Sequence, residues 1–340
     1  MSLVARTRRV HFVGIGGVGM SGLAEILCRS GHFVSGSDQS ASDTVEALRK
    51  LGAHIQIGHG EEIVVKSKPD VVVYSTAVSH ENPELRYARR ERIPIIRRAE
   101  MLAELMRLRR GIAIAGSHGK TTTTGLVALI LQEAGLDPAV VIGGRFDAIG
   151  ANATWGQGQW LVAEADESDG SFLRLSPELA VVTNIDREHL NHYGTFEKTI
   201  EAFEEFLDRL PFYGRAVLCS DCDITRKINT TLQKPSWTYG FDVNHKPDFW
   251  IELIENSAHP RFRIHRYSGS RAENEEGKYT LWLEVTLSVP GVHNVLNATA
   301  AAIVARELET KDAVILKALE KFKGVRRRFD LRGQWAAGPL

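Results

Sequence analysis

The chain has 340 residues, of which 43% are hydrophobic and 25% are charged. These proportions are ordinary for a soluble globular protein, and the length is enough for two domains with part of a third. Lysine plus arginine and aspartate plus glutamate both total 42, so no net basic field would draw the whole chain onto nucleic acid.

Cysteine content and hydropathy indicate the cellular compartment in which the chain functions. Three cysteines give no disulfide framework, which fits a reducing environment. No apolar run approaches the roughly 18 residues that a membrane span needs, and the start, MSLVARTRRV, lacks the apolar core of a signal peptide. We therefore expect a cytoplasmic protein without a membrane partner. The sequence leaves its oligomeric state open.

Up to about residue 107, short β-branched runs alternate with helical patterns. This alternation predicts a parallel sheet with helices on both faces. The predicted strands are 10–15, 32–38, 70–78 and the first part of 93–106, and the predicted helices are 17–30, 43–52 and the rest of 93–106.

The first strand runs into a glycine turn with the spacing G-x-G-x-x-G, formed by Gly14, Gly16 and Gly19. At the start of a helix this spacing is typical of a turn that holds a pyrophosphate on backbone N–H groups. Asp38 lies 19 residues beyond Gly19, at the end of the second strand, where an acid that binds ribose belongs. The alternative is that the glycines only allow close packing of the helix on the strand. The turn predicts an anion site and does not by itself select nicotinamide.

The pattern restarts at residue 111, which places a domain boundary at 108–110. Strands and helices alternate again, and then apolar and polar residues alternate between about 235 and 290. These patterns predict a second α/β unit with an antiparallel ribbon beside its main sheet. The predicted strands are 111–116, 138–144, 159–168, 178–186, 248–254, 261–268 and 279–289, and the predicted helices lie within 117–135, 293–309 and 312–322.

The strongest chemical signal is the stretch AIAGSHGKTTTT, in which a strand is followed by a glycine loop and a helix. Backbone N–H groups at such a helix start bind phosphate oxygens, Lys120 can reach the β- and γ-phosphates, and Thr121 can coordinate Mg²⁺. The spacing departs from G-x-x-x-x-G-K-[ST], because Ile114 stands where the first glycine is expected. Gly116 and Gly119 supply the tight turn instead. The alternative, an ordinary glycine turn before a helix, explains less of the pattern.

Phosphoryl transfer also needs an acid to hold the metal at the end of a neighbouring strand. Glu164 ends an apolar run at the expected place, and Asp166, Glu167 and Asp169 follow it. A further strand end carries His189, a candidate metal ligand. Each of these residues alone could belong to a solvated loop. Together with the glycine loop they predict a magnesium–nucleotide site, and the first glycine turn adds a separate site for a nucleotide-carried substrate.

Six segments, in order along nearly the whole chain, resemble the Mur ligase family of peptidoglycan synthesis. They are GIGGVGMSGLAEIL, GSHGKTTTT, EADESDGSFL, TNIDREHLNHYG, PGVHNVLNATAA and GVRRRFD. The resemblance implies an α/β fold with a Rossmann-like domain that binds the UDP-sugar (1–107), a central P-loop domain that binds ATP (108–322) and the start of a C-terminal ligase domain (323–340).

The resemblance also assigns site residues. Lys120, Glu164 and His189 would be catalytic, and Thr121, Glu164 and His189 would hold Mg²⁺. The implied ATP-binding residues are Gly116, Ser117, His118, Gly119, Lys120, Thr121, Thr122, His293, Asn294, Asn297 and Arg328. The implied UDP-sugar residues are Gly14, Gly16, Gly17, Gly19, Asp38, Ser75 and Thr76. For Asn294 and Asn297 helix capping is the alternative role.

The implied activity is ATP-driven addition of L-alanine to the lactyl carboxylate of UDP-N-acetylmuramate through an acyl phosphate, with Mg²⁺ required. Alternatives are the family's recycling ligase, which attaches a murein tripeptide to the same sugar nucleotide, and a nicotinamide-binding module. A P-loop kinase or motor ATPase would leave the amino-terminal domain unexplained. Family members have a third domain that closes over ATP, and only its start is expected in this chain. We therefore expect the chain to bind the sugar nucleotide, to bind ATP weakly and to ligate poorly or not at all.

Overall fold

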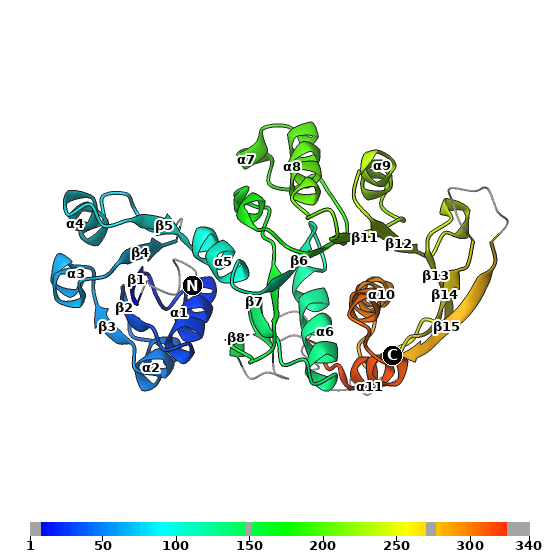
Figure 1. Ribbon diagram of the computed structural model, residues 1–340, viewed down its shortest axis with the longest axis horizontal. Helices are drawn as coiled ribbons and strands as arrows, with labels where there is room; N and C mark the ends of the chain where they lie inside the picture. Colours follow the sequence, from blue (N-terminus) through cyan, green and yellow to red (C-terminus); the bar gives the residue numbers. More distant parts are fainter. Residues whose placement is uncertain (1–7, 76, 147–150, 270–276, 325–340) are drawn as a thin grey trace, which may run out of the picture.

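The computed structural model describes residues 8–75, 77–146, 151–269 and 277–324. They form two sheets that lie one after the other along the long axis of the molecule (Figure 1). The first sheet has the strand order β3-β2-β1-β4-β5, and the second has the order β15-β14-β13-β12-β11-β10-β6-β9-β7-β8. The predicted α/β fold class is confirmed.

The first sheet is parallel throughout, as the alternation predicts. Its strands are β1 (Arg9–Val13), β2 (Phe33–Asp38), β3 (His54–Ile57), β4 (Val71–Tyr74) and β5 (Ile95–Arg97). Its helices are α1 (Val18–Arg29), α2 (Asp43–Lys50), α3 (Glu61–Ser67), α4 (Pro83–Arg90) and α5 (Arg98–Met106). Helices α1 and α5 lie toward the second sheet, and α3 and α4 lie on the far side (Figure 1).

The second sheet combines a parallel centre with antiparallel edges. Its strands are β6 (Arg110–Ala115), β7 (Ala139–Phe146), β8 (Ala151–Thr154), β9 (Trp160–Glu164), β10 (Leu179–Val182), β11 (Arg215–Cys219), β12 (Ser236–Gly240), β13 (Phe249–Glu255), β14 (Arg261–Tyr267) and β15 (Tyr279–Thr286). The pairs β13–β14 and β14–β15 are antiparallel, which confirms the predicted ribbon. A short strand, β8, also pairs antiparallel with β7 at the other edge.

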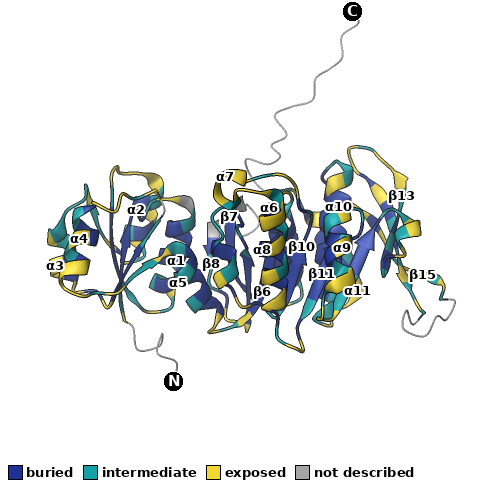
Figure 2. Cartoon of the chain, turned by 90° about the horizontal axis from the view of Figure 1, so that it is seen from above, coloured by how far each residue is buried: buried dark blue, intermediate teal, exposed yellow. Residues whose placement is uncertain are grey.

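Helices cover this sheet and bury a continuous apolar core (Figure 2). They are α6 (Lys120–Glu133), α7 (Leu190–Tyr193), α8 (Phe196–Asp208), α9 (Asp223–Thr231), α10 (Val292–Glu307) and α11 (Asp312–Lys321), with short 3₁₀ turns η2 (Ser171–Arg174) and η3 (Val243–His245). Helix α6 is apolar on nearly all sides because the sheet, α10 and α11 enclose it. Small residues of α10, among them Ala298 and Ala301, are fully buried, and α10 packs against α6.

The two sheets are joined through α1 and α5. Helix α1 packs on β7 and β8, and α5 packs on η2. Arg174 of η2 forms an ion pair with Glu100 of α5 at 2.8 Å. Helix α5 ends at Met106 and β6 begins at Arg110. None of the helices within the described ranges is long and apolar enough to cross a membrane.

A buried carboxylate ties α4 to the first two strands. His11 Nε2 lies 2.7 Å from Glu84 Oε2, and both side chains are fully buried. Ser37 Oγ donates to the same oxygen at 2.9 Å, and His59 Nδ1 lies 3.0 Å from Oε1. Burial by itself would raise the pKa of Glu84, but the hydrogen bonds and the charge of His11 lower it. The carboxylate is therefore retained in its charged form inside the domain.

We expect Glu84→Ala to lower the free energy of unfolding by about 3–5 kcal/mol, because it leaves His11 without its buried partner. The lowered pKa means that the stabilisation is present above the ordinary value of 4.5 and is lost as the pH falls through the folded-state pKa. Urea unfolding at several pH values measures both effects. Glu91→Ala, an exposed carboxylate after the same helix, is the matched control. A loss below about 1 kcal/mol at neutral pH would contradict the buried-pair interpretation.

Candidate active site

The predicted phosphate-binding loop joins β6 to α6. Gly116 has φ +125° and Gly119 has φ +86°, which are conformations that favour glycine. A Cβ on Gly116 would collide with Thr183 Oγ1, so the loop packs directly on the end of β10. Lys120 opens α6, and its Nζ donates to Gly116 O at 2.6 Å and to Glu167 Oε1 at 2.9 Å. The loop thus presents a helix start and a lysine ammonium together, as a polyphosphate requires.

Glu167 is the centre of the acidic loop after β9. Its side chain is 1% exposed, and its Oε1 lies 2.9 Å from Lys120 Nζ and 3.6 Å from His189 Nε2. Its Oε2 is buried with no hydrogen-bond partner among the described residues. A buried carboxylate oxygen without a donor is costly unless a cation occupies the position it faces.

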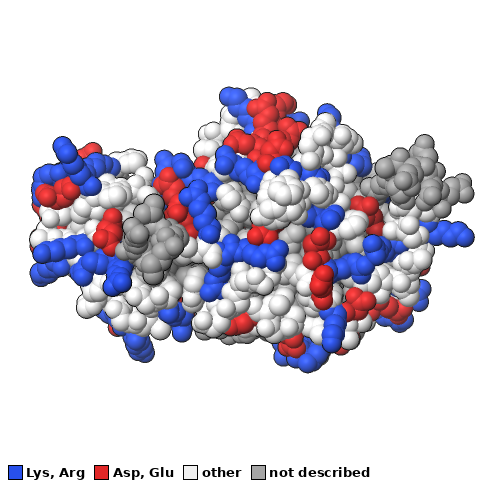
Figure 3. Space-filling view, viewed as in Figure 1, with Lys and Arg blue, Asp and Glu red and all other residues white. Residues whose placement is uncertain are grey.

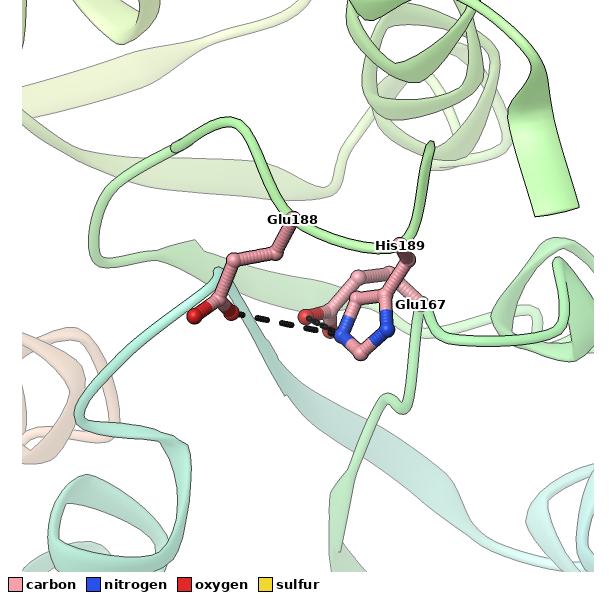
Figure 4. A group of neighbouring side chains, drawn as sticks. All are labelled: Glu167, Glu188 and His189. Carbon is pink, nitrogen blue, oxygen red and sulfur yellow. Dashed lines mark ion pairs between the residues drawn. The ribbon is translucent and has the colours of Figure 1, made fainter. Parts of the chain in front are cut away.

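Three ligand groups meet here, those of Glu167, Glu188 and His189, with one ligand atom from each within 4.8 Å of the others (Figure 4). Figure 4 shows Glu188 and His189 projecting from one loop toward Glu167 on another. His189 holds a left-handed backbone, φ +56°, which is uncommon outside glycine and concentrates at functional sites. Oxygen ligands with an imidazole fit a divalent cation such as Mg²⁺ or Mn²⁺.

The sequence prediction placed the metal on Glu164 with Thr121 and His189. The structure brings His189 into the group and puts Glu167, three residues beyond Glu164, in the buried position. Glu164 ends β9 beside Ile114 of β6, and Thr121 is buried in the first turn of α6. The assignments of Glu164 and Thr121 stay predictions. Glu188 was not among the site residues predicted from the sequence.

Hydrogen bonds hold the acidic loop in place. Tyr193 of α7 donates its hydroxyl to Glu167 O, which links the loop to the segment that carries His189. Burial, followed by the negative charges of Glu167, Asp169 and Asp166, raises the pKa of Tyr193. Burial would also raise the pKa of Asp166, but hydrogen bonds from Ser168 and the charges of nearby cations lower it below its usual value. Both groups keep their ordinary protonation states at neutral pH.

A pocket of about 470 Å³ opens beside the phosphate-binding loop. Asn297 Oδ1 accepts from Thr123 Oγ1 at 3.2 Å, and Asn297 Nδ2 donates to Asn294 Oδ1 at 3.3 Å. Asn294 in turn donates to Pro290 O. The lining residues are His118, Gly119, Thr122, Val289, Pro290, Gly291, His293, Asn294, Asn297, Phe322 and Gly324. Six of the residues predicted to bind ATP therefore line one pocket. Arg328 lies outside the described residues.

The first glycine turn lies at the carboxyl end of β1. Gly14 N and Ile15 N donate to Ser37 O at 2.9 Å, and Gly16 N donates to Asp38 Oδ2 at 2.7 Å. The carboxylate of Asp38, which was predicted to bind ribose, therefore accepts a hydrogen bond from the turn itself. A Cβ on Gly16 would lie 2.9 Å from that carboxylate oxygen, which explains why glycine is needed there.

Two hollows adjoin this turn. One, of about 310 Å³, is lined by Gly17, Gly19, Met20, Ser75, Arg97, Arg98, Ala99, Asp166, Ser168 and Asp169. The other, of about 540 Å³, is lined by Tyr74, Ala77, Val78, Ser79, His80 and Arg97. Thr76 lies outside the described residues. Arg97 and Arg98 were not among the predicted site residues, although an arginine pair between a strand and the start of a helix is typical of an anion site.

Surface charge is mixed around these sites. In Figure 3 acidic side chains gather at the top, over α8, and elsewhere on this face basic and acidic side chains are interspersed. Both signs therefore occur side by side on the visible face, in keeping with the balanced composition.

Fold and site define a class of protein: the chain belongs to the Mur ligase family. Residues 9–110 match the Mur ligase family, catalytic domain, and residues 114–305 match the Mur ligase middle domain. The chain is 52% identical over 331 residues to the UDP-N-acetylmuramate–L-alanine ligase of Thiobacillus denitrificans, which covers 96% of this chain and 68% of that protein. It is 47% identical to the ligase of the same name from Anaeromyxobacter dehalogenans, covering 98% and 69%.

Solved structures of the family show the same arrangement. UDP-N-acetylmuramate–alanine ligase from Thermotoga maritima matches with a TM-score of 0.79 and 33% identity, covering 94% of this chain and 70% of that one. UDP-N-acetylmuramate:L-alanyl-gamma-D-glutamyl-meso-diaminopimelate ligase from Neisseria meningitides matches with a TM-score of 0.81 and 25% identity, covering 94% of this chain and all of that one. Both solved structures thus have a backbone about equally similar to that of this chain, and the sequence identity is higher for the Thermotoga maritima ligase.

Proposed function

We propose that this chain is an ATP-dependent ligase that joins L-alanine to the lactyl carboxylate of UDP-N-acetylmuramate in peptidoglycan synthesis. The main support for the proposal is that Lys120 and His189 both contact the buried Glu167. The loop that carries Glu167 also lines a hollow with the other glycine turn, Gly14 to Gly19. The higher identity to alanine-adding ligases than to the tripeptide-adding ligase favours alanine as the amino acid.

The proposal divides the chain by ligand. Residues 1–107 would hold the sugar nucleotide, with its diphosphate on the turn from Gly14 to Gly19. Residues 108–322 would hold ATP, with the phosphates on the loop before α6 and the adenine in the pocket beside Asn297. Residues 323–340 would begin a further domain. The hollow that contains both Arg98 and Asp166 lies between the two ligand sites.

The chemistry is activation of a carboxylate. The lactyl carboxylate attacks the γ-phosphorus of ATP and gives an acyl phosphate and ADP. The amine of L-alanine attacks the acyl carbon, loses a proton and expels phosphate, which leaves the amide. A free carboxylate is a poor acyl donor, whereas an acyl phosphate has a good leaving group.

The chain's own residues bring two anions together. Lys120 would move from Glu167 to the β- and γ-phosphates, and the N–H groups at the start of α6 would bind the remaining oxygens. Glu167, Glu188 and His189 would hold Mg²⁺, with Thr121 on the nucleotide side. When bound, that ion supplies positive charge that offsets the repulsion between the carboxylate and the triphosphate.

We expect Gly16→Asp to abolish binding of UDP-N-acetylmuramate, because the new carboxylate would face the diphosphate beside Asp38. The control is Gly31→Asp, at the opposite end of α1, where a Cβ meets no atom within 4 Å. Calorimetric titration of both variants and the unmodified chain measures the effect. Equal affinities in all three would refute the sugar-nucleotide site. Saturable micromolar binding of NADH instead would support the nicotinamide alternative.

A further inference from the structure

Arg98 lies over the start of helix α1. A Cβ on Gly19 would be 2.9 Å from Arg98 Cδ and 3.3 Å from its Nε and Nη1. The third glycine of the turn is therefore needed to admit this arginine, which comes from α5 and not from the adjoining strand. The side chain of Arg98 is 27% exposed and lines the hollow of about 310 Å³ together with Gly17 and Gly19.

The same guanidinium faces the other sheet. Arg98 Nη2 lies 3.9 Å from Asp166 Oδ2, at the outer limit of an ion pair. Asp166 immediately precedes Glu167, which contacts Lys120. The carboxylate of Asp166 also accepts a hydrogen bond from Ser168 N at 3.1 Å. One arginine thus stands between the predicted diphosphate turn and the loop that carries the buried carboxylate.

We propose that Arg98 is a positioning residue that couples the sugar-nucleotide site to the nucleotide–metal site by exchanging Asp166 for the diphosphate of the sugar nucleotide. This inference rests on the proposed function, since it takes the turn at Gly14 to Gly19 as the diphosphate site. Its new content is a thermodynamic link between the two sites through one charge pair.

The sign of the coupling follows from the charges. A diphosphate on the turn is a stronger partner for the guanidinium than a carboxylate at 3.9 Å, so it draws Arg98 away from Asp166. Asp166 then carries an uncompensated negative charge next to Glu167, and this charge favours cations at the neighbouring site. Conversely, cations bound near Glu167 compete for Asp166 and release Arg98 for the diphosphate. Each ligand therefore strengthens binding of the other.

The test is calorimetric titration of the 340-residue chain with UDP-N-acetylmuramate, with and without a saturating non-hydrolysable ATP analogue and MgCl₂. We expect the sugar nucleotide to bind about fivefold or more tightly in the presence of the analogue. Asp166→Asn, which keeps the shape and removes the charge, should bring this ratio close to one. Arg98→Ala should do the same and also weaken binding of the sugar nucleotide alone.

Arg174→Gln is the matched control, since it breaks another arginine–carboxylate pair between the same two parts of the chain, outside the hollow. It should keep the ratio of the unmodified chain. Gly19→Ala displaces Arg98 without removing its charge and should lower the ratio. The reverse titration is a further check: the sugar nucleotide must tighten binding of the ATP analogue by the same factor as the analogue tightens binding of the sugar nucleotide.

The outcomes separate the two proposals. If the unmodified chain does not bind UDP-N-acetylmuramate, the proposed function fails and the coupling fails with it. If it binds, but Asp166→Asn and the unmodified chain show the same ratio, only the coupling is overturned. A ratio that falls equally in Arg174→Gln would also overturn it, because the effect would then belong to the interface as a whole.

Discussion

Lys120→Met is expected to weaken binding of Mg–ATP by about 10- to 150-fold, the loss that corresponds to hydrogen bonds from one charged group worth about 1.5–3 kcal/mol. Methionine keeps the aliphatic stem and removes the ammonium that reaches Gly116 O and Glu167 Oε1. Because the lysine is 17% exposed and opens α6, its charge is directed into the loop and not into bulk water. Titration with a non-hydrolysable ATP analogue in MgCl₂ measures the change.

The control for this prediction is Lys198→Met. Lys198 is an exposed lysine in the first turn of α8, so it tests removal of a lysine near a helix start without a phosphate-binding loop. The Lys198→Met variant should bind the ATP analogue as tightly as the unmodified chain does. An analogue affinity that changes less than twofold in Lys120→Met would show that the loop before α6 does not bind the triphosphate.

Glu167→Gln is expected to lower the affinity for Mn²⁺, a spectroscopic substitute for Mg²⁺, by about 100-fold or more. Loss of an outer-shell partner of a metal costs 10- to 100-fold, and a charged ligand should cost at least the upper end of that range. Glutamine keeps the size of the side chain, so the buried position stays filled. Electron paramagnetic resonance of free Mn²⁺ in the presence of ADP measures the affinity.

Glu164→Gln is the decisive comparison, because the sequence prediction placed the metal on Glu164. We expect the Glu164 variant to bind Mn²⁺ considerably more tightly than the Glu167 variant, since only Glu167 lies within 4.8 Å of ligand atoms of both Glu188 and His189 in the described group. The reverse order of affinities would restore the assignment to Glu164 and remove Glu167 from the metal site.

Local sequence patterns predicted most of the fold because each unit is built from short-range signals. β-branched runs, helix periodicity and glycine turns are local, so the parallel sheets and the ribbon β13–β15 could be read directly. In the first sheet the strand β3 and the helices α3 and α4 were not predicted, and in the second sheet the strands β8, β11 and β12 and the helices α7, α8 and α9 were not predicted. β3 is four residues long and none of its residues is buried, so it lacks the apolar run that identifies a central strand. Helix α4 is rich in arginine and its only buried apolar residues are Leu85 and Ala88, so it lacks the apolar content that identifies a core helix.

The site was predictable at the level of segments and not of single atoms. The glycine loop, the acidic run and the His189 strand end are each visible as sequence motifs. Which acid of the run is buried depends on how the chain turns after β9, and this is set by contacts such as Tyr193 to Glu167 O, 26 residues apart. The role of Arg98 depends on packing between α5 and α1, a contact that joins distant parts of the chain.

The most direct test of the account is an isotope measurement. UDP-N-acetylmuramate labelled with ¹⁸O in its lactyl carboxylate is incubated with L-alanine, Mg–ATP and the chain, and the products are collected until enough phosphate has accumulated for mass spectrometry. Each phosphate released is expected to carry one ¹⁸O atom, because the carboxylate oxygen bonds to the γ-phosphorus and stays with it when the amine displaces phosphate. Unlabelled phosphate, or ¹⁸O found in AMP, would contradict activation through an acyl phosphate.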